Sequence, residues 1–150
     1  MPRNEKIFQG EFRASVIRCL GAPLTYWKYP DLGLSTPYDC HVFKNGQFSA
    51  FELKIVKAKD TWNLKESFRN REFQIDNLMR VNVNNGRGWV VVNWFMGRGE
   101  NRAFCVRPEI CKGVLANGGT LSISEALESN MAFELPNDGF GIWDLTNLFK

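Results

Sequence analysis

The sequence predicts an α/β (α+β) fold in which helices flank one mixed β-sheet. Two segments with helical spacing of apolar residues, 4–20 and 67–83, are separated along the chain by strand-like segments. A nearly continuous apolar run over residues 89–95 is typical of a buried central strand. The predicted order of helix, three strands, helix and two strands excludes a helical bundle and a β-sandwich. A chain of 150 residues suits a single domain, which we expect to span residues 1–150.

Residues 4–20 are predicted to form the first helix. Asn4 can cap its start, because an asparagine side chain accepts hydrogen bonds from the free backbone N–H groups there. Phe8, Phe12 and Val16 recur every four residues and therefore share one side of the helix. Gly21 begins a Gly-Ala-Pro sequence that ends it.

Asn45-Gly46 predicts a β-hairpin, because this dipeptide stands between two apolar-rich runs. The hairpin strands are expected over residues 39–44 and 47–56, after a strand over 25–29 and a loop over 30–37. The later elements are predicted from apolar spacing and turn residues. In chain order they are a basic connection over 57–65, a helix over 67–83, a turn over 84–88, strands over 89–95 and 102–106, a short helix beginning at Pro108, a helical turn over 124–127, an edge strand over 131–135 and a closing helix over 142–149.

The composition is that of an ordinary globular domain, with 44% hydrophobic and 23% charged residues. No apolar stretch approaches the length of a membrane span, and no signal-peptide core follows the first residues, so we expect a cytoplasmic protein. The four cysteines have no CxxC spacing and are expected to be reduced, structural thiols. With His41 as the only histidine, a zinc site is poorly supported.

Asp39, Glu52 and Lys54 form the most informative pattern. Glu52 and Lys54 point to the same face of a strand, and folding at Asn45-Gly46 brings Asp39 beside them. Two carboxylates can bind a hard divalent cation, which activates water and stabilises charge on phosphorus. The lysine can polarise that water or bind the phosphate. This is the minimal set for a metal-dependent phosphodiesterase, although a Glu-x-Lys pair on a strand is more often a solvated surface pair.

Basic residues follow directly after Lys54. The net charge of +3 permits nucleic-acid binding without requiring it. The basic residues downstream of the predicted site, against Asp60 and Glu66, are Lys57, Lys59, Lys65, Arg69 and Arg71. They are candidates for phosphate contacts, and a solvated loop and helix face is the alternative interpretation.

The chain resembles the PD-(D/E)xK nuclease superfamily and, within it, RecU-type Holliday junction resolvases, particularly the small phage-borne ones. Four segments in order carry the resemblance: residues 38–46 (YDCHVFKNG), 51–54 (FELK), 70–78 (NREFQIDNL) and 88–95 (GWVVVNWF). The resemblance implies a restriction-endonuclease-like fold and an Mg²⁺-dependent endonuclease, with Mn²⁺ able to substitute. It also implies branched DNA as the substrate and no membrane partner.

The resemblance also implies roles for individual residues. Asp39 and Glu52 would bind Mg²⁺ with the Leu53 carbonyl, Lys54 would position or activate water, and Gln74 would hold the water or the phosphate. Paired nicks need two active sites, so a twofold homodimer is expected. The apolar side chains in the last part of the chain suit either that interface or the core; they are Phe133, Phe140, Trp143 and Phe149.

One position departs from the superfamily pattern, which usually has a glutamate after an aromatic residue on the first helix. Here Gln9 follows Phe8, and the nearest acid after it is Glu11. At about 100° per residue, Gln9 lies near the apolar side of the helix and Glu11 lies well off it. Gln9 is therefore the better candidate by geometry, and Glu11 remains the alternative. Two other functions also stay open: a restriction- or repair-type nuclease, and a DNA-binding module that has lost catalysis.

Overall fold

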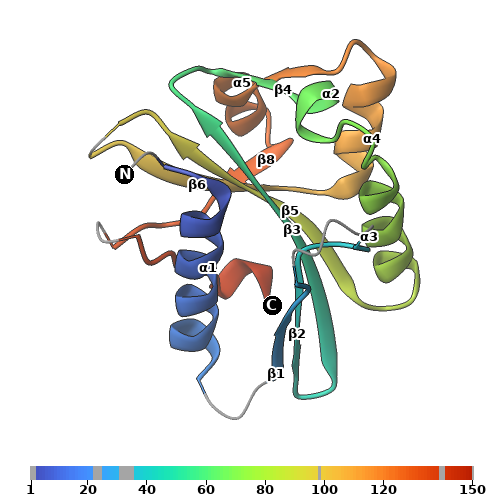
Figure 1. The fold of residues 1–150 in the computed structure, drawn as a ribbon, viewed down its shortest axis with the longest axis vertical. Helices are drawn as coiled ribbons and strands as arrows, with labels where there is room; N and C mark the ends of the chain where they lie inside the picture. Colours follow the sequence, from blue (N-terminus) through green and yellow to red (C-terminus); the bar gives the residue numbers. More distant parts are fainter. Residues whose placement is uncertain (1–2, 22–24, 31–35, 98, 139–140, 150) are drawn as a thin grey trace.

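A six-stranded mixed sheet forms the centre of the molecule (Figure 1). The computed structural model describes residues 3–21, 25–30, 36–97, 99–138 and 141–149. The strand order is β1-β2-β3-β5-β6-β8, in which β3 and β5 are parallel and the other neighbours are antiparallel. The strands of this sheet are β1 (Thr25–Lys28), β2 (Cys40–Lys44), β3 (Gln47–Lys57), β5 (Arg87–Phe95), β6 (Asn101–Val106) and β8 (Ala132–Glu134). The predicted mixed sheet flanked by helices is confirmed.

Helices cover both faces of the sheet, so the molecule has two apolar layers. On one face, α1 (Glu5–Leu20) packs Phe8 and Phe12 against Phe51 and Val91. On the other face, α3 (Phe73–Val83) and α4 (Pro108–Ala116) pack against the alternate residues of β5. Figure 1 shows α1 on one side of the sheet and α3 with α4 on the other. Because β5 is buried on both faces, its apolar run is nearly continuous.

The start of α1 and the hairpin turn follow the sequence prediction closely. The Asn4 side chain accepts a hydrogen bond from the backbone N–H of Ile7 at 3.0 Å, which confirms the predicted cap. Asn45 and Gly46 both have positive φ, 51° and 77°, as a two-residue hairpin turn requires. The start of α1 and the turn between β2 and β3 are therefore both set by local chemistry.

The segment over residues 57–65 is not an irregular connection. It contains β4 (Thr61–Asn63), which pairs with β7 (Thr120–Ser122) in a second, two-stranded sheet. Trp62 is buried against Phe104, and its indole N–H donates to Ser67 Oγ at 2.8 Å. One buried aromatic residue outweighs the basic composition that suggested an exposed loop.

The helix predicted over residues 67–83 is divided. A short helix, α2 (Leu64–Ser67), is capped by the Asn63 side chain, and α3 begins only at Phe73. Between them Asn70 has a φ of 60°, which a helix does not allow. Phe68 is fully buried at this break, so burial of its ring fixes the bend.

The last residues also differ from the prediction. Instead of a helix over 142–149, the chain forms a single 3-10 turn, η1 (Thr146–Leu148). The Asp144 side chain accepts hydrogen bonds from Thr146 N at 2.9 Å and from the Thr146 hydroxyl, a local pattern that competes with a continuous helix. Trp143 is buried against Phe8, so it serves the core, and Phe140 lies outside the described residues. The helical turn near residue 124 is α5 (Ile123–Glu128), and within the described ranges no helix is long and apolar enough to cross a lipid bilayer.

Candidate active site

Asp39 and Glu52 meet where β2 separates from β3. Asp39 immediately precedes β2, and its backbone N–H donates to Phe51 O at 3.0 Å. The backbone pairing between β2 and β3 does not extend past Asp39. The next N–H of β3 on this side, that of Leu53, donates to the Asp39 side chain, at 2.7 Å from Oδ2. Because residues 51 and 53 face the same neighbouring strand, the Leu53 carbonyl lies along this same open edge. Where the pairing of β2 with β3 stops, the Leu53 backbone and the Asp39 carboxylate therefore lie together.

Lys54 and Glu52 form a buried ion pair beside Asp39. Lys54 Nζ lies 3.0 Å from Glu52 Oε2, and the two side chains are only 6% and 2% exposed. The ammonium also lies 4.7 Å from the centre of the Phe68 ring. The Asp39 and Glu52 carboxylates interact electrostatically. The interpretation as a solvated surface pair is therefore wrong, and the burial of Glu52 and Lys54 beside a half-buried Asp39 needs a functional reason.

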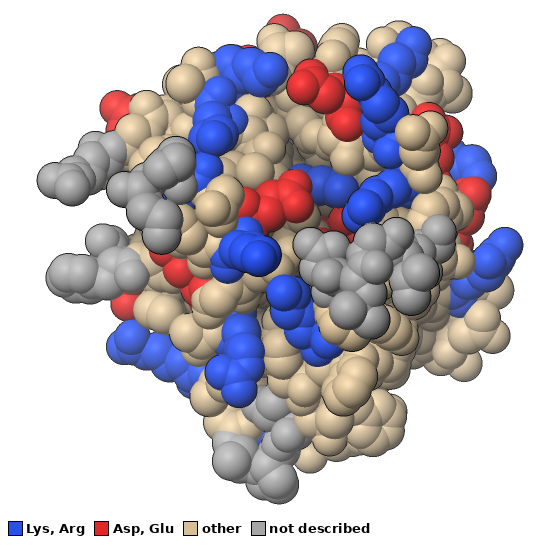
Figure 2. All heavy atoms as spheres, in the orientation of Figure 1, with Lys and Arg blue, Asp and Glu red and all other residues tan. Residues whose placement is uncertain are grey.

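A polar cavity of about 570 Å³ opens over this group. Its walls carry both signs of charge. The charged lining residues are Glu5, Asp39, Lys6, Lys28, Lys54, Arg69 and Arg71. Figure 2 shows Lys and Arg side chains gathered around a small acidic area near the middle of the face. A basic rim around buried carboxylates suits a phosphate backbone bound next to a cation.

Glu5 is the site residue that the sequence analysis missed. It lies in the first turn of α1, lines the cavity, and interacts electrostatically with Lys54 and Asp39. Partial desolvation by the surrounding cavity wall, together with the nearby Asp39 charge, raises the pKa of Glu5 above its ordinary value, although its side chain stays exposed to solvent. Gln9, one helical turn later, also lines the cavity, as predicted by its position on the helix. Since residues four apart share a helix face, the reasoning that favoured Gln9 could have found Glu5 as well.

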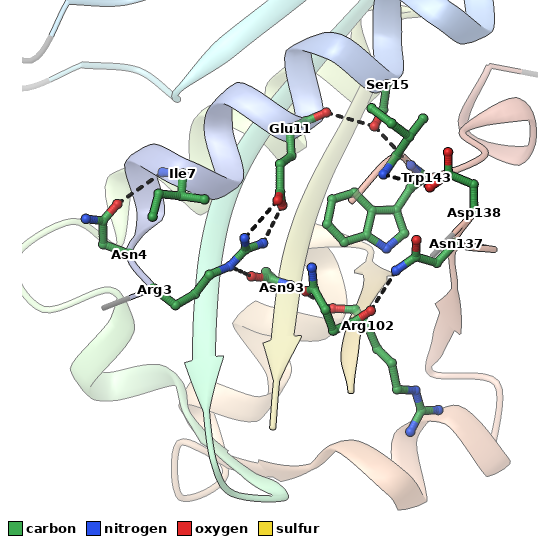
Figure 3. A network of polar contacts seen from close by, with 12 residues as sticks. Arg3, Asn4, Ile7, Glu11, Ser15, Asn93, Arg102, Asn137, Asp138 and Trp143 are labelled. Atoms are coloured by element: carbon green, nitrogen blue, oxygen red, sulfur yellow. Dashed lines mark hydrogen bonds and ion pairs between the residues drawn. The ribbon is translucent and has the colours of Figure 1, made fainter. Parts of the chain in front are cut away.

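The structure separates Glu11 from the cavity. Its carboxylate binds the Arg3 guanidinium, whose Nη1 lies 2.8 Å from Glu11 Oε2 and whose Nη2 contacts Oε1 (Figure 3). Arg3 Nε also donates to Asn93 Oδ1 of β5 at 2.9 Å. Asn93 is fully buried and donates to the Arg102 carbonyl at 2.9 Å. Glu11 thus helps to fasten the start of α1 to the sheet.

Some of the other predicted site residues line the cavity and others do not. Gln74 is fully buried in α3; its Nε2 lies 3.5 Å from the carbonyl of Thr36, which lines the cavity, and its Oε1 has no protein partner. Of the predicted basic residues, Arg69 and Arg71 line the cavity. The remaining three, which are not among the lining residues, are Lys57, Lys59 and Lys65. Lys6 and Lys28 line it instead, brought there by α1 and by the end of β1.

Burial makes the charged form of both central carboxyl groups unfavourable. Desolvation raises the pKa of Glu52, and the neighbouring Asp39 charge raises it further. Desolvation also raises the pKa of Asp39, although the Leu53 N–H and the Lys54 ammonium oppose the shift. In the metal-free protein, the buried Glu52 carboxylate next to the half-buried Asp39 carboxylate therefore destabilises the fold at neutral pH.

We expect Glu52→Gln to stabilise the metal-free protein at neutral and alkaline pH. The pKa of Glu52 is raised in the folded state, so protonated Glu52 favours folding fully at a pH below its unfolded pKa. This contribution is lost as the pH rises through the folded pKa, and the charged carboxylate is then unfavourable. Asp39 would remain as the counter-charge of Lys54. The gain should be about 1–2 kcal/mol at alkaline pH and should vanish below the ordinary glutamate pKa.

Thermal unfolding of both proteins in EDTA over this pH range measures the difference. Glu128→Gln, which changes an exposed glutamate at the end of α5, is the matched control and should show no such pH-dependent gain. A Glu52→Gln protein that is less stable at every pH would mean that the Glu52 charge is a net stabilising one.

The donor groups of this site suit a magnesium ion, which keeps several water ligands, better than a metal ion whose ligands all come from the protein. Among the residues that the structure describes, no three His, Cys, Asp or Glu side chains come together in a metal-binding group. Mg²⁺ is usually held by one or two carboxylates, with waters and substrate phosphates as its other ligands. Asp39 and Glu52 supply two carboxylates, and Glu52 Oε1 is buried without a hydrogen-bond partner. An unpaired carboxylate oxygen at this position is a free cation ligand.

Comparison with known proteins gives little beyond the geometry. No protein-family profile matches the chain, and no curated protein matches it. A similar solved structure is that of Hjc, a Holliday junction resolvase from the archaeal hyperthermophile Archaeoglobus fulgidus. The two share 10% sequence identity with a TM-score of 0.45 over 69% of this chain and 79% of that one. A likeness at this level carries no information about activity, so the function is inferred from the residues of this chain.

Proposed function

We propose that this chain is a metal-dependent endonuclease that resolves four-way DNA junctions by paired nicks. One observation carries the proposal: Asp39 and Lys54 line a cavity with a basic rim, and Glu52 is buried in an ion pair with Lys54 beside them. Enzymes place ionisable groups in such unfavourable positions chiefly where chemistry needs them. The assignment of four-way junctions as the substrate is the finer part of the proposal and follows from the motif resemblance of residues 38–54 and 70–95 alone.

Asp39, Glu52 and the Leu53 carbonyl would hold the metal, with Glu5 as a further carboxylate at the cavity wall. When bound, Mg²⁺ or Mn²⁺ would supply positive charge that favours deprotonation of water and offsets negative charge on the phosphate oxygens. The protein holds these carboxylates close together before any cation arrives, because the Leu53 N–H fixes Asp39 and the sheet register fixes Glu52. A preformed anionic site lowers the cost of reorganisation during the reaction.

Lys54 is the proposed partner of the scissile phosphate and of the attacking water. Its ammonium is held in place by Glu52 Oε2 and by the Phe68 ring. A fixed cation at this point stabilises the charge that develops on the phosphate oxygens. Gln74 remains a candidate for holding the water, and Gln9 for a neutral contact on the cavity wall.

The basic rim would bind the DNA backbone without reading bases. Arg69, Arg71, Lys6 and Lys28 lie closest to the cavity, and the proposed outer contacts are Lys57, Lys59 and Lys65. Affinity should therefore fall steeply with salt, because each phosphate contact releases counterions. Two opposed nicks need two such sites, so the proposal includes a homodimer. All four cysteines are free, which suits the reducing cytoplasm.

The proposal is tested on an immobile four-way junction and on linear duplexes of the same arm sequences. We expect symmetric nicks in opposed strands of the junction in Mg²⁺, far tighter binding to the junction than to duplex, and a dimer by sedimentation. Equal cutting of duplex and junction by a monomer would favour a repair-type nuclease. Junction binding without incision in Mg²⁺ or Mn²⁺ would favour a binding module.

A further inference from the structure

A second polar cavity lies on the face of the sheet opposite to Glu52 and Lys54. In the parallel ladder Arg87 pairs with Ser49 and Trp89 with Phe51, so these side chains alternate with those of the candidate active site. The cavity has a volume of about 650 Å³ and shares no lining residue with the cavity over Asp39. Its walls come from the start of β5, the residue before α4, β8 and η1.

Two hydrogen-bond donors of this cavity are buried and have no partner in the part of the chain that the structure describes. They are Arg87 Nη1 and Trp89 Nε1, which belong to neighbouring side chains on one face of β5. A buried donor without an acceptor destabilises a protein, and native structures rarely leave one unless water or an ion completes it. Two such donors at one cavity point to an acceptor that comes from outside the chain.

The two guanidinium groups of this cavity form no ion pair with the described residues. Arg107 stacks over the Trp89 ring at 5.2 Å, and neither Arg87 nor Arg107 forms a salt bridge there. Glu134, one of the two carboxylates of the lining, accepts from Arg102 Nε at 2.7 Å and Nη2 at 2.6 Å and so pairs with an arginine outside the lining. Glu109 keeps its negative charge, because its hydrogen-bond donor, Asn82 Nδ2 at 3.1 Å, is neutral. The two arginines therefore leave a small excess of positive charge in the cavity, which suits an anion.

We propose that this cavity, lined by Arg87, Trp89 and Arg107, is a phosphate-binding site. A phosphate group carries at least one negative charge and several acceptor oxygens, which match two guanidinium groups and an indole N–H. A carboxylate offers fewer acceptor oxygens, and a single water carries no charge. The phosphate belongs either to a free phosphate ester or to the DNA backbone away from the cleavage site. This site goes beyond the proposed nuclease activity and does not depend on it.

The indole N–H resonance of Trp89 reports binding directly. In ¹H–¹⁵N spectra of the full chain, titration with inorganic phosphate should shift this resonance saturably, whereas potassium chloride at equal ionic strength should not. The indole N–H groups of Trp62 and Trp94 already donate to Ser67 Oγ at 2.8 Å and to the Lys59 carbonyl at 2.9 Å. Their resonances should stay in place and serve as internal controls.

Two variants test the assignment of the donors. Arg87→Gln and Arg107→Gln should each weaken phosphate binding about tenfold or more, since a charged hydrogen bond is lost. Arg107 is exposed, so its variant should fold even if Arg87→Gln does not. Arg80→Gln, at an exposed arginine of α3 outside the lining, should bind phosphate like the unmodified chain. No saturable shift of Trp89, or a shift that the Arg107 variant leaves unchanged, would overturn the proposal.

The source of the phosphate is found by competition. A shift produced by a mononucleotide but not by duplex DNA would assign the cavity to a free phosphate ester. A shift produced by duplex DNA and reversed by inorganic phosphate would assign it to the DNA backbone. Either result supports a phosphate site, and the two give it different roles.

Discussion

Replacing Lys54 by Met should abolish strand incision while leaving affinity for a four-way junction within several-fold. The methionine keeps most of the apolar stem against Phe68 but removes the ammonium that Glu52 and the ring hold in place. Loss of one preorganised charge at a reacting centre costs roughly 10²–10³-fold in rate. Binding should survive, because one phosphate contact is a small part of an extended electrostatic interface.

Single-turnover cleavage and binding titrations on the same junction separate these two effects. Lys112→Met is the matched control, since Lys112 is an exposed lysine that pairs with Asp76 outside the cavity. It should cut at the normal rate. Complete loss of junction binding by a folded Lys54→Met protein would make Lys54 chiefly a DNA contact.

Glu5→Gln should reduce incision nearly as much as Asp39→Asn does. Glu5 faces Asp39 and Lys54 across the cavity, so its charge acts on the groups that would hold the cation. We expect a loss of about 10²-fold or more, as for other charged groups at a reacting centre. Part of the loss should appear as a higher Mg²⁺ requirement, because a carboxylate near the cation has been neutralised.

Glu11→Gln provides the comparison within the same helix. The glutamine can still accept a hydrogen bond from Arg3, so the start of α1 should stay in place and the rate should change little. The measurement is the incision rate of both variants over a range of Mg²⁺ concentrations. A Glu11→Gln protein that is more impaired than Glu5→Gln would return the first-helix role to Glu11.

The part of the site that is local in sequence could be predicted. Asp39, Glu52 and Lys54 lie within one hairpin, where the turn residues fix the register and strand alternation fixes the faces. The position of Gln9 at the cavity wall follows from helix periodicity, which is also local, and its role stays a prediction. The burial of the ion pair could not be predicted, because it depends on Phe68, which reaches the site through the break between α2 and α3.

The cavity residues that come from distant segments could not be predicted from local sequence. Lys28 reaches the cavity only because β1 pairs with β2, and Glu5 because α1 packs across β3. Lys57 and Lys59 follow Lys54 closely in sequence but lie outside the cavity lining. The strand within residues 57–65 could not be predicted for a related reason: its structure depends on one core residue, Trp62, in an otherwise charge-rich segment. Nothing in the local sequence indicates the second cavity, since its walls come from four separate parts of the chain.

The most direct measurement is the incision of a four-way junction by the purified chain and by its Glu52→Gln variant, in Mg²⁺, in Ca²⁺ and in excess EDTA. The structure places Glu52 at the centre of the buried charged group, and the variant should fold at least as well as the original chain. We predict incision by the original chain in Mg²⁺, binding with little incision in Ca²⁺, and none in EDTA, with the variant inactive in all three. Equal incision with and without EDTA, or a fully active Glu52→Gln protein, would contradict a metal-dependent site built on Asp39, Glu52 and Lys54.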